Sequence, residues 1–302
     1  MSYEHSEQIF HYHGYALGIG GYVARRGERW AIAGLTPGAL SISGGNNVVT
    51  QGYYSWAPTQ TEAEPQNGGF RVSASDATSE LWTEETATEW ITHGIVTINQ
   101  FNLCDRLRIG KIVSSLTSRH RKNTPDERAR ISFAGSSLQD VFLDGIRIDV
   151  DIDTPLDRIE SYAQLRGLIG GTTSLPPDGV MDADACDRWT HNFCDRNLLK
   201  EAEGDADYIT DHIRQSKAST RRMRCSIVSN LRADLPGYLK RRGYSISVEQ
   251  NGARPEFGRI FFGEIVVADG MKRLNMVRWN LGCDNCSDGT AGTVDLNGDS
   301  MP

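Results

Sequence analysis

The sequence has few cysteines and no long apolar run. Six cysteines in 302 residues are too sparse for a disulfide-stabilised scaffold, so we expect reduced thiols. No stretch approaches the roughly 18 consecutive apolar residues that a membrane span requires, and the N-terminus lacks a basic region followed by an apolar segment. These absences predict a cytoplasmic protein that does not enter a membrane.

Two common catalytic frames are also missing. There is no Gly-x-x-x-x-Gly-Lys loop to hold phosphates and no Gly-x-Ser-x-Gly frame for a serine nucleophile. The sequence therefore favours neither a P-loop nucleotidase nor a serine hydrolase of this kind.

The net charge of −7 conceals blocks of opposite sign. Residues 178–211 carry ten acids and three bases, whereas residues 214–242 carry nine bases and one acid. Such blocks can attract each other within one chain or across a subunit contact. The acidic total disfavours nucleic acid as a partner, because the basic blocks must hold phosphate against the field of the whole molecule.

A β-hairpin is the clearest local prediction. Apolar and polar residues alternate from Ile146 to Asp153, which sorts them onto opposite faces of a strand. The preceding Asp144-Gly145 supplies the positive φ angles of a tight turn after Val141 and Leu143. Short strand-like runs separated by glycine-rich turns fill residues 10–56, and further strands are predicted after residue 90.

Helical spacing appears between the strand regions. It covers residues 156–171, 182–202 and 205–217, and a short helix is predicted at 236–242. The sequence thus predicts an α+β fold, with a mainly antiparallel sheet, sandwich or barrel-like core. We expect a single β-rich domain over 1–302, a helical insertion at about 155–217 and an irregular C-terminal tail at 283–302.

Three motifs resemble a family of uncharacterised bacterial β-rich proteins. They are GSSLQDVFLDGIRIDV at 135–150, FGRIFFGE at 257–264 and RLNMVRWNLG at 273–282. The resemblance extends over 108–156 and 255–302, about a third of the chain. It implies a β-rich fold and no particular activity.

Histidines give the best candidate metal site. His11 and His13 are two residues apart on a predicted strand, so both face one side and could share a zinc or iron ion. A third ligand could come from His93 or from the acidic row Asp149, Asp151 and Asp153. The alternative is an ordinary surface strand.

The acidic row has its own two interpretations. Alternate residues of a strand lie about 7 Å apart, so Asp149, Asp151 and Asp153 could bind calcium only with help from a neighbouring loop. The alternative is a solvated strand face on which Arg147 and cross-strand bases pair with the carboxylates.

A basic run and a cysteine pair complete the candidates. Arg221, Arg222 and Arg224 could hold a phosphorylated ligand or an acidic partner surface, or could pair with the preceding acidic block. Cys283 and Cys286 have the spacing of half a zinc site, but they could equally form a disulfide or stay as free thiols.

Two functions remain open. The first is a non-catalytic interaction or assembly protein that binds a partner or like subunits, because strand edges and complementary charge blocks are present. The second is a metal-dependent enzyme that acts on a small molecule through His11 and His13 with a divalent metal. The sequence does not decide whether the protein is an enzyme.

Overall fold

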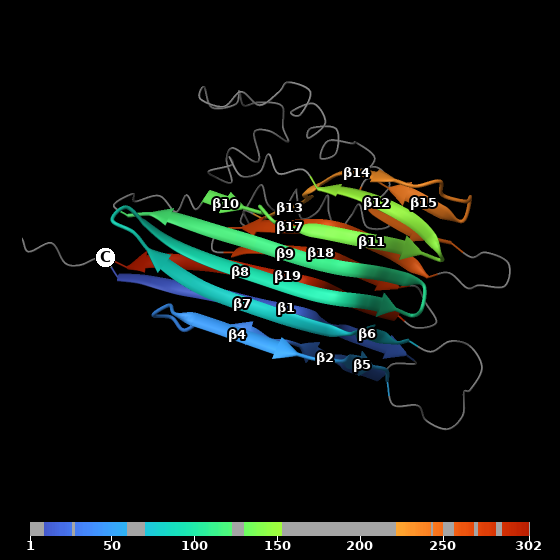
Figure 1. Cartoon of the computed structure of the whole chain (residues 1–302), viewed down its shortest axis with the longest axis horizontal. Coiled ribbons are helices and arrows are strands. Elements are labelled where there is room, and N and C mark those ends of the chain that lie inside the picture. The colour runs from blue at the N-terminus through green and yellow to red at the C-terminus, as the bar shows by residue number, and fades with distance from the viewer. Residues whose placement is uncertain are drawn as a thin grey trace, which may run out of the picture.

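In the computed structural model, the described part of the chain is all β. The described residues are 9–25, 28–58, 70–122, 130–152, 222–242, 244–249, 257–268, 271–281 and 286–301. Every regular element in these ranges is a β-strand, and the strands form two antiparallel sheets that lie face to face (Figure 1). The predicted α+β class is therefore wrong for the described chain. The predicted helical insertion at about 155–217 lies outside the described residues.

In the described part of the chain, sheet I contains nine strands. Its order is β15 (Leu239–Arg242), β16 (Ser245–Val248), β17 (Gly258–Ala268), β18 (Met271–Leu281), β19 (Cys286–Met301), β1 (Ile9–Arg25) and β2 (Glu28–Leu35), with β13 (Arg222–Ser226) beside β17 and β3 (Gly38–Ala39) beside β1. Strands near the C-terminus thus complete the sheet that begins with β1.

Sheet II contains ten strands among the described residues. Its order is β14 (Val228–Arg232), β12 (Ile146–Ile152), β11 (Ser137–Leu143), β9 (Leu107–Arg121), β8 (Glu89–Leu103), β6 (Val72–Ala74) and β5 (Tyr54–Trp56), with β10 (Arg130–Ser132) beside β9, β7 (Asp76–Glu85) beside β8 and β4 (Asn46–Gln51) beside β7. The predicted hairpin is confirmed as β11 and β12, with φ of 53° at Asp144 and 83° at Gly145.

The core fills the space between the two sheets. β1, β18 and β19 pack against β7, β8 and β9, and alternate residues of each strand point inward. The rings of Trp279 on β18 and Phe101 on β8 lie 6.1 Å apart between the sheets. Burial of this apolar surface is the main stabilising contribution that the fold offers.

The predicted irregular tail is instead a long central strand. β19 pairs with β1 on one side and with β18 on the other. Two of its glycines lie against large aromatic side chains of neighbouring strands. A Cβ at Gly289 would overlap the Trp279 ring, and one at Gly298 would overlap the Phe10 ring. The side chains that cover this part of β19 therefore come from other strands, which is why the tail itself shows little hydrophobic pattern.

The predicted helix at 236–242 is also wrong. Leu239–Arg242 form β15, which pairs with Ser245–Val248 of β16. Leucine, lysine and arginine are good helix formers, but here the pairing with a neighbouring strand overrides this local preference.

In each sheet, the residues that point into the core are even-numbered on one part of a strand and odd-numbered on the other. The switch occurs at the same level in neighbouring strands. On β19, Ala291 points inward before Gly292 and Val294 points inward after it. Gly18, Gly263, Met276 and Gly292 are aligned across β1, β17, β18 and β19, and φ is +66° at Gly292. Each strand therefore has one extra residue at the same level, so the ladder register is unchanged.

Sheet II has an equivalent row. On β8, Ile98 is buried before Gln100 and Phe101 is buried after it. Gln100, Gly110 and Asp140 are aligned across β8, β9 and β11, with φ of 52° at Gln100 and 54° at Asp140. We call these two alignments the face-switch rows.

The chain crosses from sheet I to sheet II at Ile227. Ser226 ends β13 and donates its hydroxyl to the Phe262 carbonyl at 2.8 Å, while it accepts the Val228 N–H at 2.9 Å. The Ile227 N–H donates to the Gly263 carbonyl at 2.8 Å. The crossing fixes β14 at the margin of sheet II, beside the margin of sheet I formed by β15.

Candidate functional site

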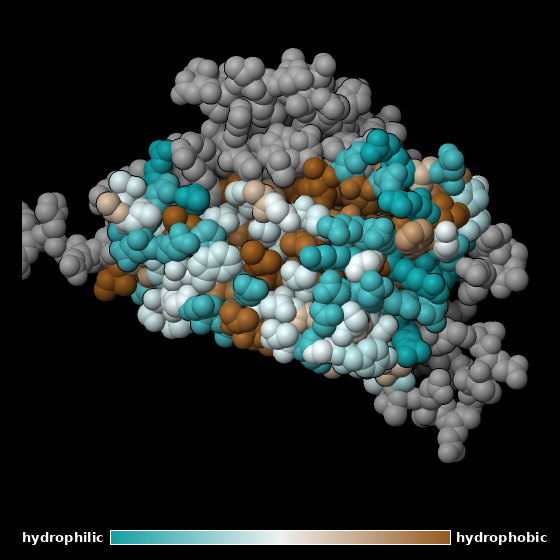
Figure 2. Space-filling model, viewed as in Figure 1, coloured by the Kyte–Doolittle hydropathy of each residue, from teal (hydrophilic) through white to brown (hydrophobic). Residues whose placement is uncertain are grey.

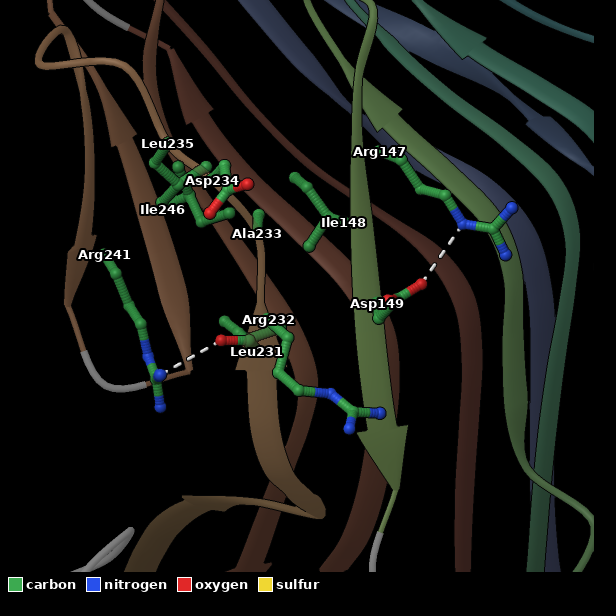
Figure 3. Close-up of a pocket in the computed structure, with 10 residues that line it drawn as sticks. All are labelled: Arg147, Ile148, Asp149, Leu231, Arg232, Ala233, Asp234, Leu235, Arg241 and Ile246. Carbon is green, nitrogen blue, oxygen red and sulfur yellow. Dashed lines mark hydrogen bonds and ion pairs between the residues drawn. The ribbon is translucent and has the colours of Figure 1, made fainter.

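A groove lies where these two margins meet. It has a volume of about 630 Å³ and is lined by parts of β12, β14, β15 and β16 and by the connection after β14. Figure 3 shows Ile148, Ala233, Leu235 and Ile246 around a space between the strands, whereas the Arg147 side chain extends from β12 to the other side. The groove is a hollow formed by described residues that combines apolar and polar side chains, so it is a candidate binding site.

The floor of the groove is apolar. Ile148 on β12, Leu231 on β14 and Ile246 on β16 are all buried, and Leu235 is partly buried beside them. Strand alternation explains the arrangement, because Ile148 points inward while its neighbours Arg147 and Asp149 point outward. The floor is therefore continuous with the core of the sandwich.

Arginines form the rim. Arg147 donates from Nε to Asp149 at 3.2 Å, and Arg232 donates to Asp151 at 3.0 Å. Both arginine side chains remain more than 60% exposed. Ion pairs as exposed as these contribute at most about 1 kcal/mol, so a ligand carboxylate can replace either aspartate at little cost.

The third arginine protects a strand edge. Arg241 on β15 donates from its guanidinium to the Leu231 carbonyl on β14 at 3.0 Å, as Figure 3 also shows. This bond occupies a backbone acceptor that points away from β12. It disfavours the addition of an extra strand at this position of β14.

The acidic row lies at this rim. Asp149 and Asp151 are on the outward face of β12, and each pairs with an arginine. Asp153 lies outside the described residues. The structure thus places two of the three predicted carboxylates beside bases, as in the solvated-face interpretation.

The predicted histidines are not brought together. His11 and His13 lie on the outer face of sheet I, since the alternate residues Phe10 and Tyr12 are buried. His93 lies on the outer face of sheet II, on the opposite side of the sandwich. One ion cannot bind all three.

His93 has a well-defined environment of its own. Its ring stacks on Trp82 with centroids 4.6 Å apart, and its Nδ1 lies 3.0 Å from the Thr117 hydroxyl. Burial lowers the pKa of His93, an effect that the nearby Glu84 carboxylate opposes. These contacts fix the ring in the sheet surface as a packed side chain.

The remaining candidates are only partly described. Arg222 and Arg224 are on β13, opposite Ala268 and Val266 of β17. Arg221 and Cys283 lie outside the described residues. Cys286 begins β19, paired with Ala24.

A buried histidine was missed in the sequence. His120 on β9 points into the core, where its ring lies 4.9 Å from that of Phe10 and its Nε2 lies 3.2 Å from the Ser118 hydroxyl. Burial, together with the nearby Lys272 charge, lowers the pKa of His120 to about 3. It is therefore neutral at physiological pH, and only its alternation with Ser118 on a strand could have suggested that it is buried.

The groove arginines were partly signalled by the sequence. Arg232 and Arg241 belong to the basic block at 214–242, and Arg147 was expected to pair with the acidic row. No pattern along the chain indicates that these two regions meet, because their contact depends on the crossing at Ile227.

A cluster of metal-binding side chains and a membrane-spanning helix are both absent from the described part of the chain. Its residues contain no group of three or more His, Cys, Asp or Glu side chains placed to hold a metal ion. Nor do they contain a helix with the length and apolar character required to span a membrane.

Comparison with known proteins gives a family without a function. No curated protein and no solved structure matches the chain. Residues 10–268 match the model of a family described as a domain of unknown function, DUF8256. The predicted membership in an uncharacterised β-rich family is thereby confirmed, and the chain belongs to the DUF8256 family.

Proposed function

We propose that the protein is a non-catalytic interaction module of the cytoplasm that binds an extended acidic polypeptide segment in the groove. The observation that carries this proposal is the combination of an apolar floor with three arginines at the rim. A segment that alternates apolar and acidic residues matches both parts at once.

The apolar half of the match comes from the floor. Ile148, Leu231 and Ile246 belong to the packed core, so they are held in place before a ligand arrives. A preformed site loses little conformational entropy on binding. Leucine-sized side chains on one face of an extended segment would cover this floor.

The charged half comes from Arg147 and Arg232. Each donates a hydrogen bond to an aspartate, and each side chain is more than 60% exposed. A guanidinium can hold a carboxylate through two parallel hydrogen bonds, which gives direction as well as attraction. Because Arg241 occupies the Leu231 carbonyl, the segment would bind mainly through side chains and not as an added strand.

A second copy of this chain is one source of such a segment. The basic block that contains Arg232 and Arg241 was predicted to attract the acidic block at 178–211 either within one chain or across a subunit contact. That prediction stands untested, as does the alternative of a metal-dependent enzyme at His11 and His13.

The experiment measures peptide binding by fluorescence anisotropy. The probe is a short fluorescein-labelled peptide of alternating Leu and Glu, and the competitors have Leu and Lys or Ser and Glu instead. We expect only the Leu and Glu peptide to bind well. The double variant Arg147→Gln, Arg232→Gln should weaken it about tenfold, equivalent to ~1.4 kcal/mol.

Arg119→Gln is the matched control, because Arg119 is another exposed, ion-paired arginine of sheet II, 3.4 Å from Glu89. It should leave binding unchanged. Equal binding of the Leu and Lys peptide, or unchanged binding by the double variant, would contradict the proposal.

A further inference from the structure

β4 is an open margin of sheet II at the end opposite the groove. In the described part of the chain it pairs only with β7, and Figure 1 shows it as the last strand beyond β7. A strand with one unpaired side presents a row of backbone donors and acceptors. Natural proteins usually protect such a side with charged residues.

β4 lacks this protection. Between Arg29 and Glu62 the sequence contains no Asp, Glu, Lys or Arg, although 24% of the whole chain is charged. The margins at the groove carry bases, as in Arg232 on β14 and Lys240 on β15. The absence of charge is therefore not a property of all margins of the fold, although β5 and most of β2 share it with β4.

The side chains of this margin are also unusually apolar and exposed. Val48 on β4 is 57% exposed, and Ile42 and Tyr53 in the segments before and after β4 are 53% and 71% exposed. These are three of the five large hydrophobic side chains that stand out as exposed in the described structure. Figure 2 shows hydrophobic and weakly polar residues reaching the lower margin of this face, where β4 lies.

The hydrogen-bond pattern between β4 and β7 shows which backbone groups of β4 face away from β7. The Thr83 N–H donates to the Gly45 carbonyl at 3.0 Å, so residue 45 is turned toward β7. Bonding alternates along an antiparallel ladder, so residues 47, 49 and 51 also face β7. The N–H and C=O groups of Asn46, Val48 and Thr50 therefore point to the open side.

We propose that β4 pairs antiparallel with β4 of a second copy of this chain, around a two-fold axis at Val48. Val48 then lies opposite the partner's Val48, and Asn46 lies opposite the partner's Thr50. Each of the three facing pairs exchanges two backbone hydrogen bonds. The two sheets II become one continuous sheet through the dimer.

Self-pairing is favoured over a charged partner by the chemistry of the strand. When β4 pairs antiparallel with β4 of a second copy, each residue faces one defined residue of the partner strand. No such pair brings like charges together, because β4 has no charged residue. The central contact joins two exposed valines, which lose water-accessible apolar surface on pairing. A charged segment would gain no ion pair from β4.

The test changes Val48 and measures molecular mass by sedimentation velocity at micromolar concentrations. Val48→Lys puts two like charges at the two-fold axis, and its own sheet tolerates the change because Glu80 lies opposite on β7. We expect the wild type to be a dimer and Val48→Lys to be a monomer. Val48→Glu should also be monomeric, and an equimolar mixture of the two variants should recover the dimer.

Gln139→Glu supplies the control for charge and folding. Gln139 is exposed on β11, a strand between β9 and β12, and it lies opposite Lys111 of β9, so this variant should dimerise like the wild type. Thermal melting of all variants shows whether they remain folded. A wild type that is monomeric, a Val48→Lys variant that still dimerises, or a failure of the mixture to associate would overturn the proposal.

Salt separates this dimer from assembly through charge blocks. The β4 contact contains no charged pair, so raising the salt concentration should leave the wild-type dimer intact. Dissociation by salt would show that the charge blocks, and not β4, hold the subunits together.

Discussion

Gly289 of β19 lies against the indole ring of Trp279 on the neighbouring strand. The two residues face each other across the ladder, and a Cβ at Gly289 would overlap the ring. The ring has nowhere to move, since Trp279 is fully buried and its Nε1 donates to the Ser287 hydroxyl at 2.9 Å. We expect Gly289→Ala to lower the free energy of unfolding by about 1–3 kcal/mol.

Urea denaturation measures this change against a glycine without neighbours. A Cβ at Gly52 would meet nothing within 4 Å, and Gly52→Ala should be neutral or raise stability by up to about 1 kcal/mol. Equal losses at both positions would show that the close contact at Trp279 has no energetic effect.

The second prediction concerns pH and His120. Its pKa is lowered from 6.5 to about 3 in the folded protein, because burial and the Lys272 charge oppose protonation. The unfolded chain therefore binds more protons than the folded one between these values. Stability from this group is fully present above pH 6.5 and is lost as pH falls toward 3, by up to about 1.4 kcal/mol per pH unit.

Urea unfolding at a series of pH values measures the slope. His120→Phe removes the titrating group and keeps a ring beside Phe10, so its stability should depend less steeply on pH over this window. An identical slope in the variant and the wild type would assign the acid sensitivity to other groups.

The third prediction concerns the ion pair between Glu264 and Arg278. Arg278 Nε lies 3.0 Å from the Glu264 carboxylate, and the side chains are 1% and 16% exposed for Glu264 and Arg278. The guanidinium also lies 3.7 Å from the centroid of the Phe261 ring. Glu264→Ala leaves a charge without its partner and should cost about 3–5 kcal/mol.

Asp149→Ala provides the comparison, because its pair with Arg147 is 52% and 64% exposed for the two side chains. It should cost at most about 1 kcal/mol. A Glu264→Ala variant as stable as Asp149→Ala would mean that the buried pair contributes no more than a surface one.

Local features of the fold were predictable from the sequence. Asp144-Gly145 specifies its turn by backbone angles alone, and the alternation from Ile146 needs no knowledge of other strands. Strands of this kind were correctly expected at β1, β17 and β18.

Features that depend on distant strands were not predictable. Gly289 and Gly298 look like turn residues until Trp279 and Phe10 are placed against them. The face-switch rows shift the alternation by one residue in the middle of each strand, which weakens any pattern read along it. The groove was not predictable for the same reason, because Arg147 and Arg232 become neighbours only when β12 and β14 pair.

The face-switch rows also restrict how this family can change in length. Deleting Gly292 alone would turn every later residue of β19 to the opposite face, so Val294 and Leu296 would leave the core. The change becomes harmless only if β1, β17 and β18 each lose their aligned residue as well. Among DUF8256 sequences, insertions and deletions at this level should therefore occur in several strands together or not at all.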